Sequence, residues 1–132
     1  MSENRKSSLT TLDWYRLNEA CRPIRVGLGA CTYLVGTANS GGTYRDVDVR
    51  TILGDEEFDR LFRDKPEFWS LLCSSIAMRL VAATGLPIDY QVQRMTEANV
   101  KYPDGNRNPL GLHNITTLAG SGDATRFAGV GG

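Results

Sequence analysis

Histidine is almost missing from this chain, whose 132 residues include only His113. A zinc site built on imidazoles and a Ser-His-Asp triad therefore have almost nothing to draw on, and any metal would be bound through oxygen atoms. Cysteine is scarce too, since Cys21, Cys31 and Cys73 are widely spaced and form no Cys-x-x-Cys pair. Such an odd set indicates reduced, mostly buried thiols of an intracellular protein rather than a disulfide framework.

A net charge and a long apolar run are missing as well. The 15 Lys and Arg residues balance 15 Asp and Glu residues, so the chain lacks the overall positive field of a typical nucleic-acid-binding protein. No apolar run approaches the roughly 20 residues of a membrane span. The polar first residues also lack the apolar core of a signal peptide. We therefore expect a cytoplasmic protein with no membrane partner.

The composition that is present, 41% hydrophobic and 23% charged, is typical of one globular domain. We place this domain at residues 9–111, behind a disordered polar arm at residues 1–8. Five glycines follow His113, and this composition predicts a flexible tail over residues 112–132.

The apolar patterns predict a mixed α/β (α+β) domain, in which a small mixed sheet is flanked by helices. Residues 31–35, 45–53 and 88–93 have the alternation or the β-branched content of strands. Three-residue and four-residue spacings predict a helix over residues 11–20, ending before Pro23, a helix capped by Asp55, and a helix from Pro66 to Thr84. Residues 39–42 and 101–111 are expected to be loops.

The strand at residues 45–53 has an unusual charged face. Asp46, Asp48 and Arg50 alternate with the apolar side, so their side chains point the same way. Mg²⁺ is bound by one or two carboxylates together with water and substrate phosphates, and two such ions promote nucleotidyl transfer. Asp89, on a later strand, is the candidate for a third carboxylate. The sequence therefore predicts that Asp46, Asp48 and Asp89 bind Mg²⁺ or Mn²⁺.

Glycine-rich turns lie just before this strand. Gly36 and Thr37 end the preceding strand, and Ser40 and Gly41 follow in the loop. Their backbone N–H groups suit the oxygens of a triphosphate.

In these features the chain resembles the nucleotidyltransferases of the polymerase-β superfamily. In that family a strand ending in Gly-Ser precedes a strand with Asp-x-Asp, where x is apolar, and a later strand carries a third acid. Here Gly36-Thr37, Asp46-Val47-Asp48 and Ile88-Asp89 stand at these positions, and the resemblance covers residues 31–93. The small size is similar to that of stand-alone members, which are often found in phage genomes.

The resemblance implies a polymerase-β-like fold, Mg²⁺ as cofactor and an NTP as substrate. Asp46 and Asp48 would hold two ions, and Asp89 would complete one site and help to activate the attacking hydroxyl. Gly36, Thr37 and Ser40 would bind the triphosphate. The acceptor, whether RNA, protein or a small molecule, stays open.

Arg50 leaves two interpretations open. Its guanidinium is suited to grip a phosphate, or it neutralises Asp48 in place of a metal. The second case describes a catalytically inactive domain of the same fold that serves as a protein-binding or nucleotide-binding module. An acidic interaction surface with no link to nucleotides is a third possibility, favoured if Asp89 lies far from the acid pair. A further hypothesis makes Arg107 and Asn108 part of a lid over the substrate.

Overall fold

The computed structural model describes residues 8–103 and 106–112, so most of the expected arm and tail lies outside the described residues. The helices in this part are α1 (Thr11–Leu28), α2 (Gly36–Ser40), α3 (Asp55–Phe62), α4 (Pro66–Thr84) and α5 (Met95–Lys101). The strands are β1 (Cys31–Val35), β2 (Val47–Leu53), β3 (Ile88–Arg94) and β4 (Asn108–Leu110).

The four strands form one mixed sheet in the order β3-β2-β1-β4. β1 is antiparallel to both β2 and β4, whereas β2 is parallel to β3. The parallel pair requires a crossover, which α3 and α4 provide. The predicted mixed α/β class with a mixed sheet is therefore confirmed.

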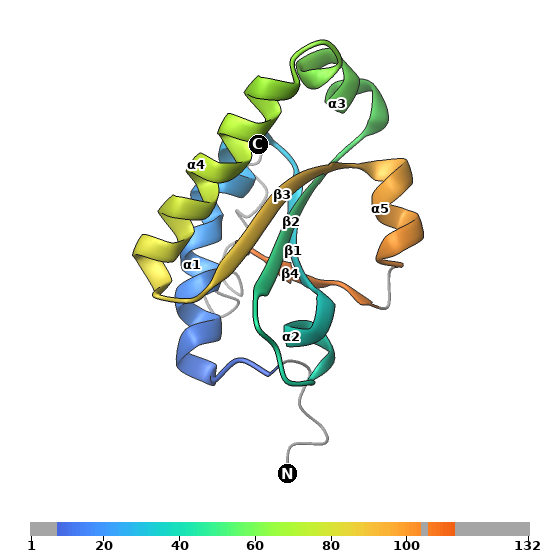
Figure 1. Ribbon diagram of the computed structural model, residues 1–132. Helices are drawn as coiled ribbons and strands as arrows, with labels where there is room; N and C mark the ends of the chain where they lie inside the picture. The colour runs from blue at the N-terminus through green and yellow to red at the C-terminus, as the bar shows by residue number, and fades with distance from the viewer. Residues whose placement is uncertain (1–7, 104–105, 113–132) are drawn as a thin grey trace, which may run out of the picture.

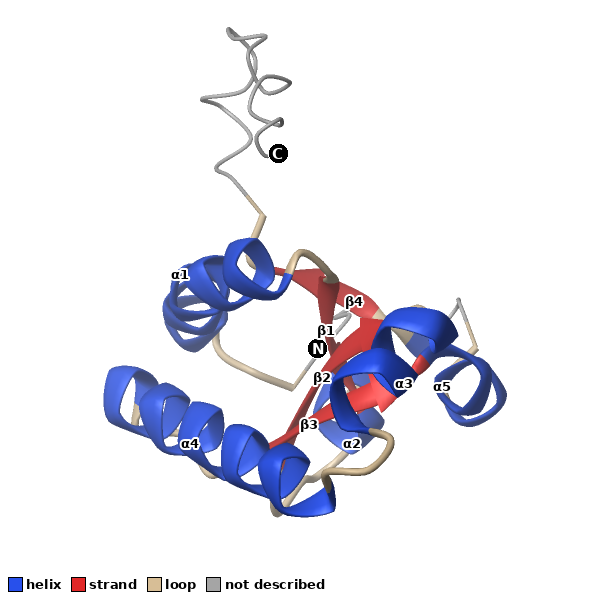
Figure 2. Ribbon diagram, turned by 90° about the horizontal axis from the view of Figure 1, so that it is seen from above, coloured by secondary structure: helices blue, strands red, loops and turns tan. Residues whose placement is uncertain are grey.

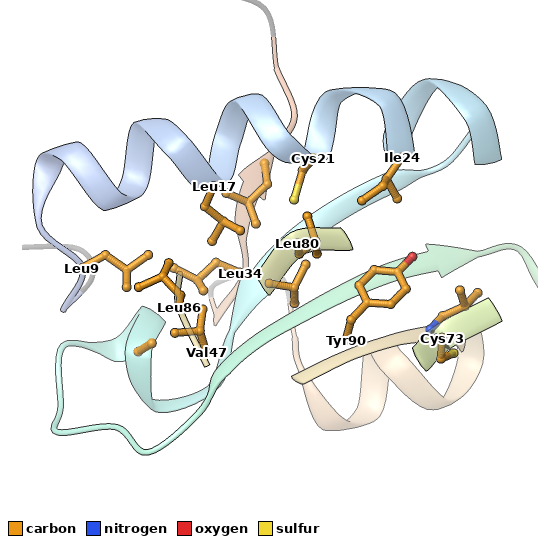
Figure 3. Packing of buried hydrophobic residues seen from close by; sticks show 14 of the residues in the cluster. Leu9, Leu17, Cys21, Ile24, Leu34, Val47, Cys73, Leu80, Leu86 and Tyr90 are labelled. Atoms are coloured by element: carbon orange, nitrogen blue, oxygen red, sulfur yellow. Dashed lines mark hydrogen bonds between the residues drawn. The ribbon is translucent and has the colours of Figure 1, made fainter. Parts of the chain in front are cut away.

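Helices lie on both faces of the sheet. Figures 1 and 2 show α1 and α4 side by side on one face and α5 on the other. Leu17, Cys21 and Ile24 of α1 point from the helix into the core, where they meet Leu34 and Leu80 (Figure 3). In the part of the chain that is described, no helix combines the length and apolarity needed to cross a membrane.

Three hydroxyl groups are buried within this core. The Tyr90 hydroxyl donates to Oγ1 of Thr51 at 2.7 Å, and Thr51 and Thr32 share a hydrogen bond of 2.8 Å. The chain of hydroxyls crosses β3, β2 and β1, so the polar atoms of these core residues are satisfied without water.

The outer edge of β3 is covered by α4. The Trp69 indole N–H donates to the Val92 carbonyl at 2.9 Å, and the Val92 N–H donates to Sγ of Cys73 at 3.4 Å. Both backbone groups of Val92 are therefore satisfied, although no fifth strand pairs with this edge among the described residues.

The predicted end of α1 is wrong, whereas the predicted bounds of α4 are confirmed. α1 continues past Pro23 to Leu28, although proline cannot donate the hydrogen bond of a helical residue. The helix persists because Leu17, Cys21 and Ile24 on the same face are buried, so packing outweighs the lost bond. α4 spans Pro66–Thr84 with Gly85 as its left-handed cap, as predicted.

Two of the expected loops contain regular structure. Residues 36–40 form α2, and β4 lies within residues 101–111. β4 contains Asn108, which pairs with Leu34 of β1, so the hypothesis that Asn108 belongs to a lid is wrong. Such a short strand has no alternation of its own and exists because β1 offers a free edge.

Candidate functional site

The parallel register of β2 and β3 brings two of the predicted acids together. Asp48 is the direct partner of Asp89. The residues that flank Asp48, Val47 and Val49, are fully buried on the core side, so both carboxylates lie on the face that carries α5. Asp46 is exposed and lies just before the first residue of β2, close enough for its charge to act on the carboxyl of Asp48. The three predicted acids therefore gather at one end of the sheet.

Gly36 is in contact with the carboxylate of Asp48. The antiparallel register pairs Val35 with Asp48, and Gly36 follows at once with a φ of +74°. A Cβ atom built on Gly36 would lie 2.3 Å from Oδ2 of Asp48. Both the left-handed backbone and the close approach of the Asp48 carboxylate disfavour a side chain at this position.

Arg50 lies between the two neighbouring acids. Its Nη1 is 3.6 Å from Oδ1 of Asp89, and its Nη2 is 4.0 Å from Oδ1 of Asp48. Nη1 also donates to the backbone carbonyls of Asp89 at 2.7 Å and Val49 at 3.0 Å. The residue is only 5% exposed. The guanidinium thus links the backbones of β2 and β3 and also lies beside the carboxylates of Asp48 and Asp89.

The electrostatics of the site centre on Asp48. Burial raises the pKa of Asp48, and the neighbouring Asp89 and Asp46 raise it further, against the attraction of Arg50 and Lys101. A carboxyl whose pKa is raised on folding binds more protons in the native state, so its contribution to stability declines as pH rises above the ordinary pKa of an aspartate. The fold therefore keeps the charge of Asp48 at a cost in stability.

Lys101 is a member of this site that the sequence reasoning missed. It is the last residue of α5, and its charge acts on the carboxyl of Asp48. The helix was not predicted because its seven residues follow β3 without a break. Nothing in the sequence around Lys101 indicates that the chain after Asp89 turns back toward Asp48.

The predicted triphosphate residues occupy different parts of α2. Gly36 and Thr37 begin the helix, whereas Ser40 ends it and donates its hydroxyl to the Thr37 carbonyl at 3.1 Å. The N–H groups of Gly41 and Gly42 also donate to Thr37. The expectation that the N–H group of Gly41 is free for phosphate is therefore wrong, because this group bonds to the helical turn.

Arg107 lies one strand away from the acids. Its guanidinium stacks over the Tyr33 ring at 5.2 Å, and its Nε donates to the Tyr102 carbonyl at 2.7 Å. Tyr33 is the register partner of Arg50. A hollow of about 360 Å³ opens beside Tyr33, at the end of the strands that carries Cys31 rather than Asp48.

The carboxylates of Asp48 and Asp89 fit a magnesium ion whose remaining coordination positions are filled by other ligands. In residues 8–103 and 106–112, no group of three or more His, Cys, Asp or Glu side chains is close enough to hold a metal. Asp48 and Asp89 supply two neighbouring carboxylates, which is the number that Mg²⁺ uses when substrate phosphates complete its coordination. Asp48 and Asp89 therefore supply two of the oxygen ligands that such an ion would need.

Comparison of the chain with protein-family models, with curated proteins and with solved structures finds no match.

Proposed function

We propose that this protein is a small nucleotidyltransferase that moves an NMP from an NTP to a hydroxyl acceptor, with Mg²⁺ as cofactor. The observation that carries the proposal is the direct pairing of Asp48 with Asp89, beside a glycine whose backbone contacts the Asp48 carboxylate. This is the same pattern of glycine, paired acids and third acid that the polymerase-β superfamily displays along its sequence.

Each residue has a role in the proposed reaction. Asp46 and Asp48 would hold the divalent ions, with Asp89 completing one of the two sites beside Asp48, and the ions would neutralise the triphosphate and polarise the α-phosphate. Asp89 would accept the proton of the acceptor hydroxyl, whose oxygen attacks the α-phosphorus and displaces pyrophosphate. Gly36 and Thr37 would bind phosphate oxygens through the backbone and the exposed Thr37 hydroxyl.

Arg50 supports a second candidate, a module of this kind that binds a nucleotide without turning it over. Its guanidinium is within 3.6 and 4.0 Å of the two acids. A cation at this position weakens the case for two metal ions, because it offsets part of the charge that they would neutralise.

A thermal-shift titration separates the two candidates. Wild type, Asp48→Asn and the control Asp64→Asn are each melted with the four NTPs, with and without Mg²⁺. Asp64 is exposed in the connection between α3 and α4, so its amide variant tests the loss of an unrelated carboxylate. A ligand at a hundredfold its Kd stabilises the native state by about 2.7 kcal/mol, which is easily measured.

We expect one NTP to raise the melting temperature of wild type and Asp64→Asn only with Mg²⁺, and not to raise that of Asp48→Asn. Transfer of an α-³²P-labelled NMP to candidate acceptors then follows with the same variants. A shift that needs neither Mg²⁺ nor Asp48 would favour the binding module. No shift with any NTP, in a folded wild type, would contradict both candidates.

A further inference from the structure

Arg50 is held in place by the backbone of two strands. Nη1 donates to the carbonyls of Val49 and Asp89 at 3.0 and 2.7 Å. Nε is buried and has no hydrogen-bond acceptor among the described residues. A side chain that is 5% exposed and bound in this way is fixed relative to the sheet.

This anchoring argues against Arg50 as a clamp for a phosphate. Bidentate binding of a phosphate uses two parallel N–H groups of the guanidinium. Here Nη1 is occupied by two carbonyls and Nε is buried, so only Nη2, which faces Asp48, is left. To reach a phosphate with its fork, Arg50 would have to give up both carbonyls.

The same anchoring makes Arg50 a permanent charge beside the acids. With Asp46, Asp48 and Asp89 ionised, the carboxylates carry three negative charges, and Arg50 together with Lys101 reduces the net charge of the five groups to −1. One divalent ion already exceeds this charge. A further ion is favoured only when a ligand brings additional negative charge, as a triphosphate does.

We propose that Arg50 is a built-in cation that holds Asp48 and Asp89 together and weakens the binding of free divalent ions, so that metal binds mainly with the nucleotide. This inference rests on the proposed function for its nucleotide part. Arg50 is a positioning residue in this account, since it acts through the two carboxylates and contacts no substrate.

The test measures metal binding alone. Free Mn²⁺ is followed by electron paramagnetic resonance during titration of the full chain without nucleotide, for wild type, Arg50→Gln and Arg50→Lys. Arg50→Gln removes the charge and can still donate to a backbone carbonyl, whereas Arg50→Lys keeps the charge and loses the fork. We expect Arg50→Gln to bind Mn²⁺ about tenfold or more tightly than wild type, because the two carboxylates lose a unit positive charge that lies 3.6 and 4.0 Å from their oxygens. Arg50→Lys should stay close to wild type.

Unchanged or weaker Mn²⁺ binding by folded Arg50→Gln would overturn the inference. A similar gain in both Arg50 variants would overturn it too, because the effect would then follow the altered structure and not the charge. If Arg50→Gln does not fold, the comparison is made in the Asp89→Asn background, where one repelling carboxylate is absent. Arg50→Gln/Asp89→Asn must then bind Mn²⁺ more tightly than Asp89→Asn alone.

The nucleotide part has a separate readout. In wild type, the NTP that shifts the melting temperature should tighten Mn²⁺ binding, and this gain should be smaller in Arg50→Gln. If no NTP shifts the melting temperature, the proposed function fails, while the Mn²⁺ titrations of Arg50→Gln and Arg50→Lys still decide whether Arg50 is the built-in cation.

Discussion

A comparison of Gly36, which lies in the site, with Gly85, which lies outside it, isolates the contact between Gly36 and Asp48. Both have a left-handed backbone, with φ of +74° and +76°. A Cβ atom on Gly85 would meet nothing within 4 Å, whereas one on Gly36 would lie 2.3 Å from Oδ2 of Asp48. An alanine would have the same backbone strain at either position, but only at position 36 would its Cβ atom collide with the Asp48 carboxylate.

We expect Gly85→Ala to lower the free energy of unfolding by about 1–2 kcal/mol, the cost of a left-handed non-glycine residue. Gly36→Ala should cost about 1–3 kcal/mol more, because the Asp48 carboxylate must move. Urea denaturation measures both variants. Equal losses would show that the contact between Gly36 and Asp48 has no energetic weight.

The same pair separates stability from function. Gly36→Ala should abolish the Mg²⁺-dependent response to NTP, because it would displace the Asp48 carboxylate that is proposed to bind the metal. Gly85→Ala should keep the response at temperatures where it is folded. Retention of the response in Gly36→Ala would contradict the proposed role of Asp48.

At the scale of elements, α3 supplies the cap of α5. Asp55 was predicted to cap its own helix, but the N-cap of α3 is Gly54, and the Asp55 carboxylate accepts the backbone N–H of Thr96 at 2.9 Å. It also bonds to the Thr96 hydroxyl. Arg94 makes a two-point contact with Asp59 at 3.0 and 3.1 Å. Side chains of α3 thus fix the start of α5, the helix that brings Lys101 to the site.

The pH dependence of Asp55→Asn tests this cap. The hydrogen bonds from Thr96 lower the pKa of Asp55 below its ordinary value. A carboxyl of this kind stabilises the protein above its unfolded pKa, and the stabilisation is lost as pH falls through the folded pKa. Asp55→Asn should therefore melt below wild type at neutral pH, with a difference that shrinks as wild type is acidified. Calorimetry at several pH values measures it.

Glu56→Gln is the matched control, since Glu56 is exposed in the same turn of α3. It should leave the melting temperature close to that of wild type at each pH. A difference for Asp55→Asn that does not change with pH would mean that its charge has no part in capping α5.

At the scale of the whole molecule, Asn18 joins residues that are far apart in the chain. Its Oδ1 accepts the N–H groups of Gly111 and Leu112 at 2.8 and 3.2 Å, and its Nδ2 donates to the Leu112 carbonyl at 3.1 Å. One side chain of α1 therefore satisfies three backbone groups beyond β4, where Gly111 packs on the Cys21 carbonyl.

We expect Asn18→Ala to lower the free energy of unfolding by about 1–3 kcal/mol, because the part-buried N–H of Gly111 and the two exposed backbone groups of Leu112 lose their partner. Asn18→Asp keeps the acceptor and loses only the amide donor, so its loss should be smaller. Urea denaturation with an unchanged m-value would report this as a change in stability. A loss for Asn18→Asp as large as that for Asn18→Ala would show that the amide donor, and not the acceptor, carries the bridge.

Where each residue points in β2 could be predicted from the sequence. The alternation of Val47, Val49 and Thr51 with Asp48 and Arg50 places the first set in the core, and all three are fully buried. α4 was equally predictable, since Pro66 suits its start and Gly85 its end. These features depend on the local period of the chain and on the local geometry of proline and glycine.

Other features depended on contacts between distant segments. α1 passes Pro23 because its inner face is buried, and β4 exists because β1 has a free edge. α2 and α5 have only 5 and 7 residues, too few for a periodic pattern to be recognised. Burial against neighbours outweighed local propensity in each case.

That Asp48 and Arg50 share a face follows from the amino-acid sequence alone, because side chains alternate along any strand. Only the tertiary structure decided that Asp89 is the neighbour of Asp48, since the register of a parallel pair is set by the α3–α4 crossover and its packing. It also decided the position of Arg50, which depends on a carbonyl of β3 that is 39 residues away in the chain. The local residue pattern specifies which way the side chains of a strand point, whereas the packing of the elements decides which distant strands become neighbours.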